Sequence, residues 1–417
     1  MRVGDIHEAE LTKLGAQGDG LGTLRGQPLY VPLGLPGETV KVKLARAIGD
    51  GFQADLLEVV TPSSLRVQPP CPHYSHCGGC SLQHLEGAAY LEHKQAVVSG
   101  ALRQHRLGSE AVLPILGLSG PTRRRLTLAA VGGKNRTILG FNARASATVV
   151  DVQSCLIARP ELVRVLPLLR TALADWFGKV RTLDLSLTLA SNGLDLLLTG
   201  PEPDLVAREA IAALSNHFIR ISWRKSERSE PEPMLMHQPP TITLGGIPVA
   251  YPAGTFLQPS LEGEAELTRQ VQRALEGVSG RVADLFSGLG TFALPLLKTH
   301  DVVAYDSDGA AMTALAATRQ PRLTTEARDL FREPLSAREL TGLAAVVIDP
   351  PRAGAQAQCA TLAQSDIPVI AMVSCNPGTF ARDALTLISG GYRLDWVQPI
   401  DQFLWSSHVE LVARFSR

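Results

Sequence analysis

The chain has 417 residues, which is enough for about three domains and for a core that needs no disulfides. Hydrophobic residues make up 45% and charged residues 19% of it, a composition that excludes a disordered or fibrous protein. The 40 Lys and Arg residues balance 40 Asp and Glu residues, so any nucleic-acid binding must rest on local basic patches.

The N-terminal sixty residues predict a small β-barrel. Glycines interrupt short apolar stretches, and the segments 39–44 and 54–60 are apolar or alternating at strand length. Closely spaced turns of this kind are typical of small closed sheets. A Thr-Pro-Ser-Ser turn at 61–64 ends this module, so we expect a first domain over residues 1–62.

No segment predicts export or membrane insertion. Residues 1–13 carry five charges and no apolar run, unlike a secretory signal. The longest uncharged stretch, 233–261, contains six prolines and three glycines, which argues against a membrane helix. We therefore expect a soluble, cytoplasmic protein, in which six cysteines do not indicate a disulfide framework.

The middle of the chain predicts an α+β domain over residues 63–240. Two segments, 90–105 and 162–176, have helical periodicity. Four strand-like segments form two predicted hairpins. The first joins 125–130 to 137–141 around the turn at 132–135, and the second joins 183–189 to 194–198 around Asn192-Gly193. A proline-rich stretch near 236–240 separates this region from the last third.

The last third, 241–417, predicts a doubly wound α/β domain with a Rossmann-like parallel sheet. Helical stretches such as 309–318 alternate with short, almost continuous apolar runs at 282–286, 302–305, 345–348 and 369–373. Strands that are apolar on both faces indicate a parallel sheet, because helices cover both of its faces.

A glycine-rich motif follows the first of these strands. DLFSGLG (284–290) allows a tight turn and the close approach of a ligand at the carboxyl end of the strand. Asp306 ends the next strand, eighteen residues past Gly288, where an acid can hold ribose hydroxyls. The loop lacks GxGxxG spacing, so the pattern favours a nucleoside ligand over a dinucleotide.

Three further motifs place reactive groups at strand ends. DPPR begins at Asp349, SCNP contains Cys375, and HVE ends in Glu410 at the start of a terminal strand. Carboxyl ends of parallel strands share one edge of a sheet, so we expect Asp349 and Cys375 beside the same cleft.

The chain resembles the S-adenosylmethionine-dependent uracil-C5 RNA methyltransferases in a series of motifs. Along the chain they are Gln258, DLFSGLG, DPPR, SCNP and HVE. Phe380-Ala-Arg-Asp383 also matches that family, and the N-terminal module resembles its TRAM domain, an OB-like RNA-binding barrel. The resemblance covers essentially the whole chain. It implies that the helical part near 88–118 packs on the catalytic domain.

The resemblance implies a role for each motif. Cys375 would add to carbon 6 of uracil, and Glu410 would remove the carbon-5 proton after methyl transfer. S-adenosylmethionine would be bound by Gln258, Phe286, Thr291, Asp306, Asp329 and Asp349. Family members often have asparagine in place of Thr291 and glutamate in place of Asp306, and the segment before Asp329 is shorter than usual here.

Four cysteines carry a second implication. Cys71, Cys77 and Cys80, together with the distant Cys155, resemble the [4Fe-4S] site of the ribosomal-RNA branch of the family. Structural zinc is the rival interpretation, although the chain lacks the paired CxxC motifs of a zinc ribbon. A radical enzyme is disfavoured because its usual three-cysteine spacing is missing.

We expect an RNA partner, most readily bacterial 23S ribosomal RNA, and a monomeric enzyme. The alternatives are the T-loop uridine of transfer RNA and a non-catalytic RNA-binding or assembly factor. Single-stranded loops are the expected target, because the chemistry needs an unstacked base. The candidate contacts are basic residues of the barrel and the middle domain: Lys41, Lys43, Arg46, Arg123, Arg124, Arg125, Lys134, Arg136 and Arg144.

Overall fold

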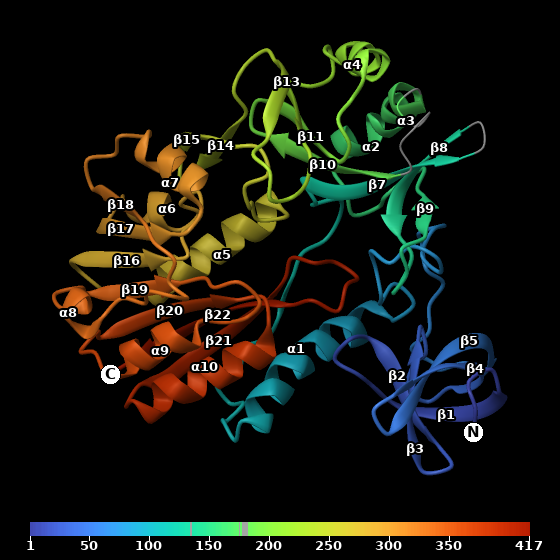
Figure 1. Cartoon of the computed structure of the whole chain (residues 1–417). Helices are drawn as coiled ribbons and strands as arrows, with labels where there is room; N and C mark the ends of the chain where they lie inside the picture. The colour runs from blue at the N-terminus through green and yellow to red at the C-terminus, as the bar shows by residue number, and fades with distance from the viewer. Residues whose placement is uncertain (134–135, 175, 177–181) are drawn as a thin grey trace.

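Five N-terminal strands close into a barrel in the computed structural model, which describes residues 1–133, 136–174, 176 and 182–417 (Figure 1). They pair in the order β1-β2-β3-β5-β4 and comprise β1 (Ile6–Leu14), β2 (Asp19–Leu24), β3 (Gln27–Pro32), β4 (Thr39–Ile48) and β5 (Gly51–Thr61). Alternation on β4 buries Val40 and Val42 and exposes Lys41 and Lys43. The barrel predicted from the glycine-punctuated sequence is confirmed.

A mixed seven-stranded sheet forms the middle of the molecule, in the order β13-β12-β11-β10-β7-β8-β9. Its strands are β7 (Arg125–Gly133), β8 (Arg136–Asn142), β9 (Val149–Asp151), β10 (Thr182–Ala190), β11 (Gly193–Thr199), β12 (Arg220–Arg224) and β13 (Glu232–Met236). The predicted hairpin at Asn192-Gly193 joins β10 to β11. Residues 134–135 of the other predicted turn lie outside the described residues.

Three short helices pack against this sheet, namely α2 (Pro160–Arg164), α3 (Leu166–Ala174) and α4 (Leu205–Ala212). The single helix expected over 162–176 is divided, with α2 ending at Arg164 and α3 beginning at Leu166. Pro167 explains the break, because it has no N–H to continue the hydrogen-bond ladder of α2.

An eight-stranded sheet carries the catalytic motifs, in the order β18-β17-β16-β19-β20-β22-β21-β6. Its strands are β16 (Arg281–Leu285), β17 (Asp301–Asp306), β18 (Leu323–Ala327), β19 (Ala345–Ile348), β20 (Val369–Ser374), β21 (Arg393–Asp401), β22 (Glu410–Ser416) and β6 (Leu116–Gly117). The strands β16 to β20 run parallel, and β22 runs antiparallel to both of its neighbours. The doubly wound α/β fold predicted from the apolar runs is confirmed.

Helices cover both faces of this sheet (Figure 1). One apolar core involves α5 (Leu261–Ala274), α6 (Ala293–Leu296), α7 (Gly309–Ala316) and the hairpin β14 (Thr241–Leu244) and β15 (Ile247–Ala250). The core on the other face involves α1 (Gly87–Gln104), α8 (Ala337–Leu340), α9 (Gln356–Ala363) and α10 (Pro377–Ser389). Among the described residues, no helix is long and apolar enough to cross a membrane.

Helix α1 is fixed to the catalytic sheet by buried polar contacts. The Lys94 ammonium group pairs with Asp401, the last residue of β21. The Tyr90 hydroxyl donates to the same carboxylate at 2.5 Å and accepts from the backbone N–H of Trp405 at 2.8 Å. Because a buried charge is costly without a partner, these contacts hold the loop between β21 and β22 in one position against α1.

Candidate active site

The glycine loop after β16 is fixed by Asp306 at the end of β17. Oδ2 of Asp306 accepts from the backbone N–H of Gly288 at 2.8 Å, and its Oδ1 accepts from that of Asp308 at 2.7 Å. Phe286 has φ of +62° and Gly288 has φ of +51°, so the chain turns sharply at the carboxyl edge of the sheet. Asp306 therefore organises the loop on which a nucleoside would lie.

Gln258 and Asp349 are in contact at the same carboxyl edge of the sheet. Nε2 of Gln258 lies 3.4 Å from Oδ2 of Asp349, and Nε2 of Gln402 donates to Oε1 of Gln258 at 3.1 Å. Burial and the carboxylate of Asp306 raise the pKa of Asp349 to about 7. Thus two sequence-predicted cofactor residues are in contact, and Gln402 is a positioning residue that sequence reasoning missed.

Arg124 was expected to meet RNA, and that expectation is wrong. Its side chain is 1% exposed and forms a buried ion pair with Glu264 at 2.5 Å. Its Nε donates to the backbone carbonyl of Gln258 at 3.0 Å. Arg124 therefore joins the middle sheet to the segment that carries Gln258, and the burial of its guanidinium prevents contact with phosphate.

Asp284, the first residue of the glycine motif, is also part of this edge. It is fully buried, and neither of its carboxylate oxygens has a hydrogen-bond partner among the described residues. Burial raises the pKa of Asp284 well above its ordinary value, the carboxylates of Asp349 and Asp306 add to the shift, and the nearby backbone N–H of Ala293 opposes it. An unpaired acid at this position suits a cationic ligand. The sequence offered a signal for Asp284, because it is the acid at the first position of DLFSGLG.

Asp329 lies beyond the end of β18, where its Oδ1 accepts from the backbone N–H of Phe331 at 3.0 Å. The ring of Phe331 is 49% exposed, and its centroid lies 5.4 Å from that of Phe286. The exposed ring of Phe331, beside the partly buried ring of Phe286, offers an apolar surface for a flat base. The sequence analysis did not single out Phe331, although its position two residues after the candidate cofactor residue Asp329 was a usable signal. Thr291 is half-buried in the turn that precedes α6.

The predicted nucleophile and base lie at the ends of paired strands. Ser374, the last residue of β20, pairs with Leu411 of antiparallel β22, so Cys375 and Glu410 occupy the next positions across the ladder. Both line one cavity of about 560 Å³, hereafter the catalytic pocket, which Gln258 also lines. The structure therefore brings together a thiol, a carboxyl group and a predicted cofactor residue.

Both groups hold their protons tightly in this pocket. Burial raises the pKa of Glu410 to about 8, the carboxylate of Asp349 contributes, and a hydrogen bond with Gln402 opposes the rise. Burial raises the pKa of Cys375 to about 11, with contributions from Glu410 and Asp349, while Arg352 acts in the opposite direction. A positive charge in the pocket would lower both pKa values.

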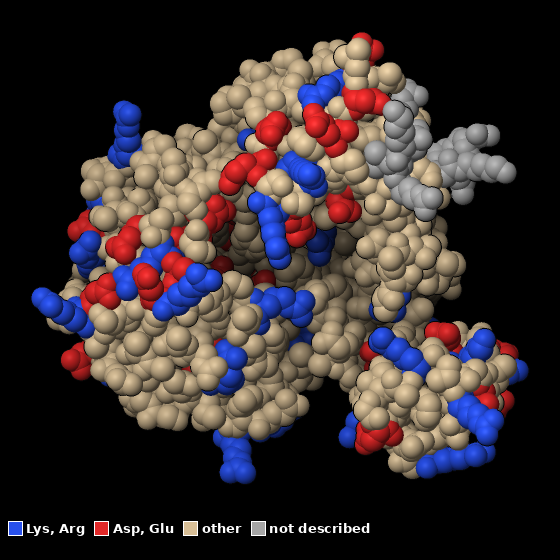
Figure 2. All heavy atoms as spheres, viewed as in Figure 1, with Lys and Arg blue, Asp and Glu red and all other residues tan. Residues whose placement is uncertain are grey.

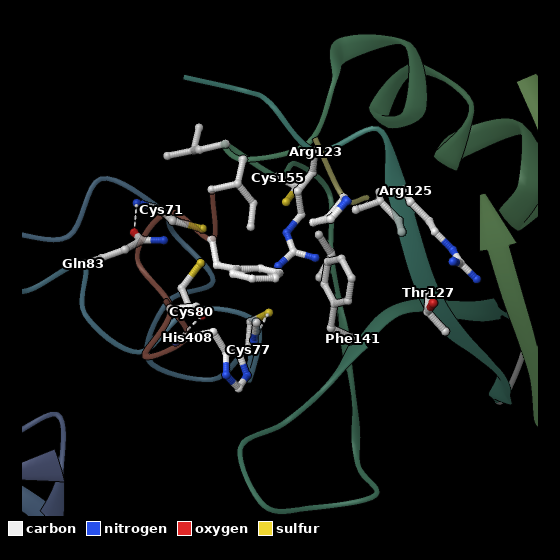
Figure 3. Close-up of a pocket in the computed structure, with 18 of the residues that line it drawn as sticks. Cys71, Cys77, Cys80, Gln83, Arg123, Arg125, Thr127, Phe141, Cys155 and His408 are labelled. Atoms are coloured by element: carbon white, nitrogen blue, oxygen red, sulfur yellow. Dashed lines mark hydrogen bonds between the residues drawn. The ribbon is translucent and has the colours of Figure 1, made fainter. Parts of the chain in front are cut away.

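The four predicted cluster cysteines line the same catalytic pocket. Figure 3 shows the sulfurs of Cys71, Cys77, Cys80 and Cys155 around one space, into which the guanidinium of Arg123 extends. Burial raises the pKa of the Cys80 thiol to about 12 and also raises the pKa values of Cys77 and Cys155. Within the described ranges, no three His, Cys, Asp or Glu side chains form a site for a single metal ion.

The remaining basic candidates divide between surface and pocket. Lys41, Lys43 and Arg46 are exposed on β4, and Figure 2 shows Lys and Arg side chains on the barrel surface and around the hollow beside it. Arg123 and Arg125 are half-buried in the lining of the catalytic pocket. Arg144 donates to the backbone carbonyl of Cys80 at 3.0 Å. Lys134 and the side chain of Arg136 lie outside the described residues.

Two family models match the chain. Residues 247–416 match the tRNA (uracil-5-)-methyltransferase family, and residues 1–48 match the TRAM domain. The chain is also 40% identical to an uncharacterized RNA methyltransferase of Mesorhizobium japonicum, with 96% of each chain covered. A similar protein of Caulobacter vibrioides is 39% identical over 99% of this chain and all of its own.

Two better-described relatives name a reaction. The 23S rRNA (uracil(1939)-C(5))-methyltransferase of Chromohalobacter salexigens is 30% identical over 96% of this chain and 87% of its own. The crystal structure of the tRNA (uracil-54, C5)-methyltransferase of Pyrococcus abyssi with S-adenosyl-L-homocysteine superposes with a TM-score of 0.77 at 25% identity, covering 98% and 99% of the two chains. With its barrel, its α/β domain and its motifs, this chain belongs to the S-adenosylmethionine-dependent uracil-C5 RNA methyltransferases.

Proposed function

We propose that the chain methylates carbon 5 of one uridine in RNA through a covalent bond between Cys375 and carbon 6 of the base. The observation that carries this proposal is the convergence of Cys375, Glu410 and Gln258 on one pocket. Carbon 5 of uracil is a poor nucleophile until a thiolate adds to carbon 6, which turns the ring into an enolate. Cys375 is the thiol in that pocket whose neighbour across the ladder is a carboxyl group.

The reaction then needs a methyl donor and a base. S-adenosylmethionine, when bound, supplies an electrophilic methyl group and a positive charge. Beside that charge, the carboxyl groups of Asp349 and Glu410 ionise more readily, because a cation lowers the pKa of a neighbouring acid. Glu410 then accepts the proton from carbon 5, and the Cys375–carbon 6 bond breaks to return the thiolate.

The residues at the sheet edge suit this co-substrate. Asp284 is buried near Asp306 and Asp349, and a sulfonium or amino group bound beside it would favour its ionised form. The paired rings of Phe286 and Phe331 offer a surface for the adenine. Gln258, held by Gln402, lies beside Asp349 and lines the pocket that contains Cys375. Asp329 and Thr291 complete the proposed cofactor set.

We also propose that Cys71, Cys77, Cys80 and Cys155 hold a [4Fe-4S] cluster. The four thiols line one cavity, and that shared lining is the observation that supports this assignment. A four-iron cluster is larger than a zinc ion, so its thiolates lie farther apart. Methyl transfer moves no net electron, so the proposed role is to hold the loop that carries three of the cysteines.

The proposed substrate is 23S ribosomal RNA, with transfer RNA as the second candidate. The four-cysteine set and the Chromohalobacter relative favour ribosomal RNA. The Pyrococcus structure and the description of the family model favour transfer RNA. Both substrates present a uridine in a loop, which an enzyme can take out of its stack.

Methyl transfer to separated RNAs tests the proposal. The purified protein is incubated with methyl-labelled S-adenosylmethionine and with unmodified 23S ribosomal RNA or transfer RNA, and the labelled nucleosides are then identified. We expect 5-methyluridine in one of the two RNAs. Label at another atom, or no label in either RNA, would contradict the proposal. The Cys359→Ala variant is the matched thiol control, because Cys359 is buried in α9 away from the pocket.

A further inference from the structure

A second pocket meets the catalytic pocket at the nucleophile. It has a volume of about 390 Å³, within the range of about 300–1,000 Å³ that is usual for pockets of small ligands. Arg352, Cys375 and His408 line both pockets, so Cys375 lies at the junction. Gln258, Glu410 and the cysteine loop are on the catalytic side, and the far side is formed by other elements. No cofactor or catalytic role described above uses that far side.

Three elements build the far side of the second pocket. The turn between β1 and β2 contributes Leu14, Ala16 and Gln17, which makes the barrel a direct neighbour of the catalytic cysteine. Helix α10 contributes its first turn after Cys375. Helix α1 contributes small side chains at helical spacing, and these leave room beside it: Ala96, Val97, Gly100 and Ala101.

The polar groups of this pocket suit one nucleotide. The side chain of Arg352 has no ion-pair or hydrogen-bond partner among the described residues, so its guanidinium is available to a phosphate. Nε2 of His93 is buried and likewise has no partner in the described part of the chain. Burial lowers the pKa of His93 to about 4, so its ring is neutral and can hydrogen-bond a base edge.

We propose that the second pocket binds the nucleotide next to the target uridine on the same RNA strand. This inference rests on the proposed function, because it takes the target uracil to lie on Cys375 in the catalytic pocket. A base that has left its stack carries its strand with it, so the neighbouring nucleotide must occupy space adjoining the nucleophile. The second pocket is such an adjoining space, lined by Arg352 and by the small side chains of α1. The barrel would thus help to select the sequence around the uridine.

A leucine at position 100 fills this pocket with little risk to folding. Gly100 lies within α1, and a Cβ placed on it meets only the end of the Arg103 side chain, at 3.9 Å. Leucine is also a better helix former than glycine. Gly87→Leu is the matched control, because Gly87 begins the same helix, has open space around its Cβ position and lines neither pocket.

The test measures methylation of the shortest ribosomal or transfer RNA fragment that the wild-type enzyme accepts. Two further versions of this fragment are made, each with an abasic ribose on one side of the target uridine. We expect Gly100→Leu to raise the KM for the intact fragment about tenfold, the scale of one lost base contact. One abasic replacement should raise the KM of the wild-type enzyme by a similar factor. The two changes together should have no larger effect than either alone, since they remove the same contact.

Three results would overturn the proposal: an unchanged KM for Gly100→Leu, two effects that multiply, or an equal loss in Gly87→Leu. Binding of S-adenosylhomocysteine, measured by calorimetry, should stay unchanged in both variants, which separates a blocked RNA site from a damaged fold. If the wild-type enzyme methylates no RNA, the proposed function has failed. If it methylates RNA and Gly100→Leu matches it, only the second pocket has been misassigned.

Discussion

The two walls of the catalytic pocket are built in different ways. One wall, hereafter the strand wall, consists of strand ends, where the pairing of β20 with β22 fixes the positions of Cys375 and Glu410. The other is the irregular segment 71–81. Single hydrogen bonds hold it, such as those from the N–H of Gly78 to the carbonyl of Asn142 at 3.0 Å and from the N–H of Ser81 to the carbonyl of Trp405 at 2.8 Å. A ladder fixes its residues cooperatively, whereas a loop held by isolated bonds opens at lower cost. The strand wall is therefore preorganised, and the cysteine wall is the one that the proposed cluster would stabilise.

The largest expected effect comes from removing the nucleophile on the strand wall. Cys375→Ala should lower the rate of methyl transfer at least about a thousandfold, because no enolate forms without addition to carbon 6. Binding of S-adenosylhomocysteine should change little, since the cofactor edge does not depend on this thiol. Measured turnover near the wild-type rate would show that another group attacks carbon 6.

Glu410→Gln, on the same wall, should block the reaction at a later step than Cys375→Ala does. Addition and methyl transfer can proceed, but without a base the proton stays on carbon 5 and elimination stalls. We expect turnover to fall at least about a hundredfold. A protein–RNA adduct that carries the labelled methyl group should appear on denaturing gels.

The adduct has its own controls. It should vanish when Cys375 is also replaced, and it should persist when Cys359 is replaced. Normal turnover of Glu410→Gln would misassign the base. Asp349 would then be the next carboxyl group to replace, because its charge acts on both Glu410 and Cys375.

Cys77→Ser tests the cysteine wall. Protein purified without oxygen should contain iron and sulfide in equal amounts, and the variant should lose both. RNA affinity should fall about tenfold as the loop loosens, while S-adenosylhomocysteine should bind as in the wild type, since its proposed site lies on the other wall. One zinc per wild-type chain, without sulfide, would establish the rival metal instead.

The two walls also differ in how far the sequence predicts them. Apolar runs at strand length predicted β16, β17, β19 and β20, and a motif at each strand end predicted its site residues, because parallel strands bring their carboxyl ends to one edge. Spacing along the chain cannot reveal partners that are distant in sequence. The burial of Arg124 against Glu264 depends on how the middle sheet docks on the α/β domain. The bond from Gln402 to Gln258 joins residues 144 apart within that domain, and no local pattern encodes it.

The smallest expected effect concerns the sheet edge beside the strand wall, where neither carboxylate oxygen of the buried Asp284 has a hydrogen-bond partner among the described residues. Its folded-state pKa is raised, so the folded protein retains a proton that the unfolded chain releases above about pH 4. Wild-type stability should therefore decrease as the pH rises from about 4 toward neutrality and above. Asp284→Asn removes this titration, so its advantage in melting temperature should grow over that range to about 3 °C.

The same change should weaken binding of S-adenosylhomocysteine about fivefold, because the amide brings no negative charge to the amino group of the ligand. Asp301→Asn is the matched control, since Asp301 is exposed at the opposite end of the neighbouring strand β17. It should change neither the pH profile of melting nor the affinity. A melting temperature that falls at every pH in Asp284→Asn would mean that this carboxyl group stabilises the empty protein. Its place at the sheet edge would then be structural, and Asp306 and Asp349 alone would supply the charge that faces the ligand.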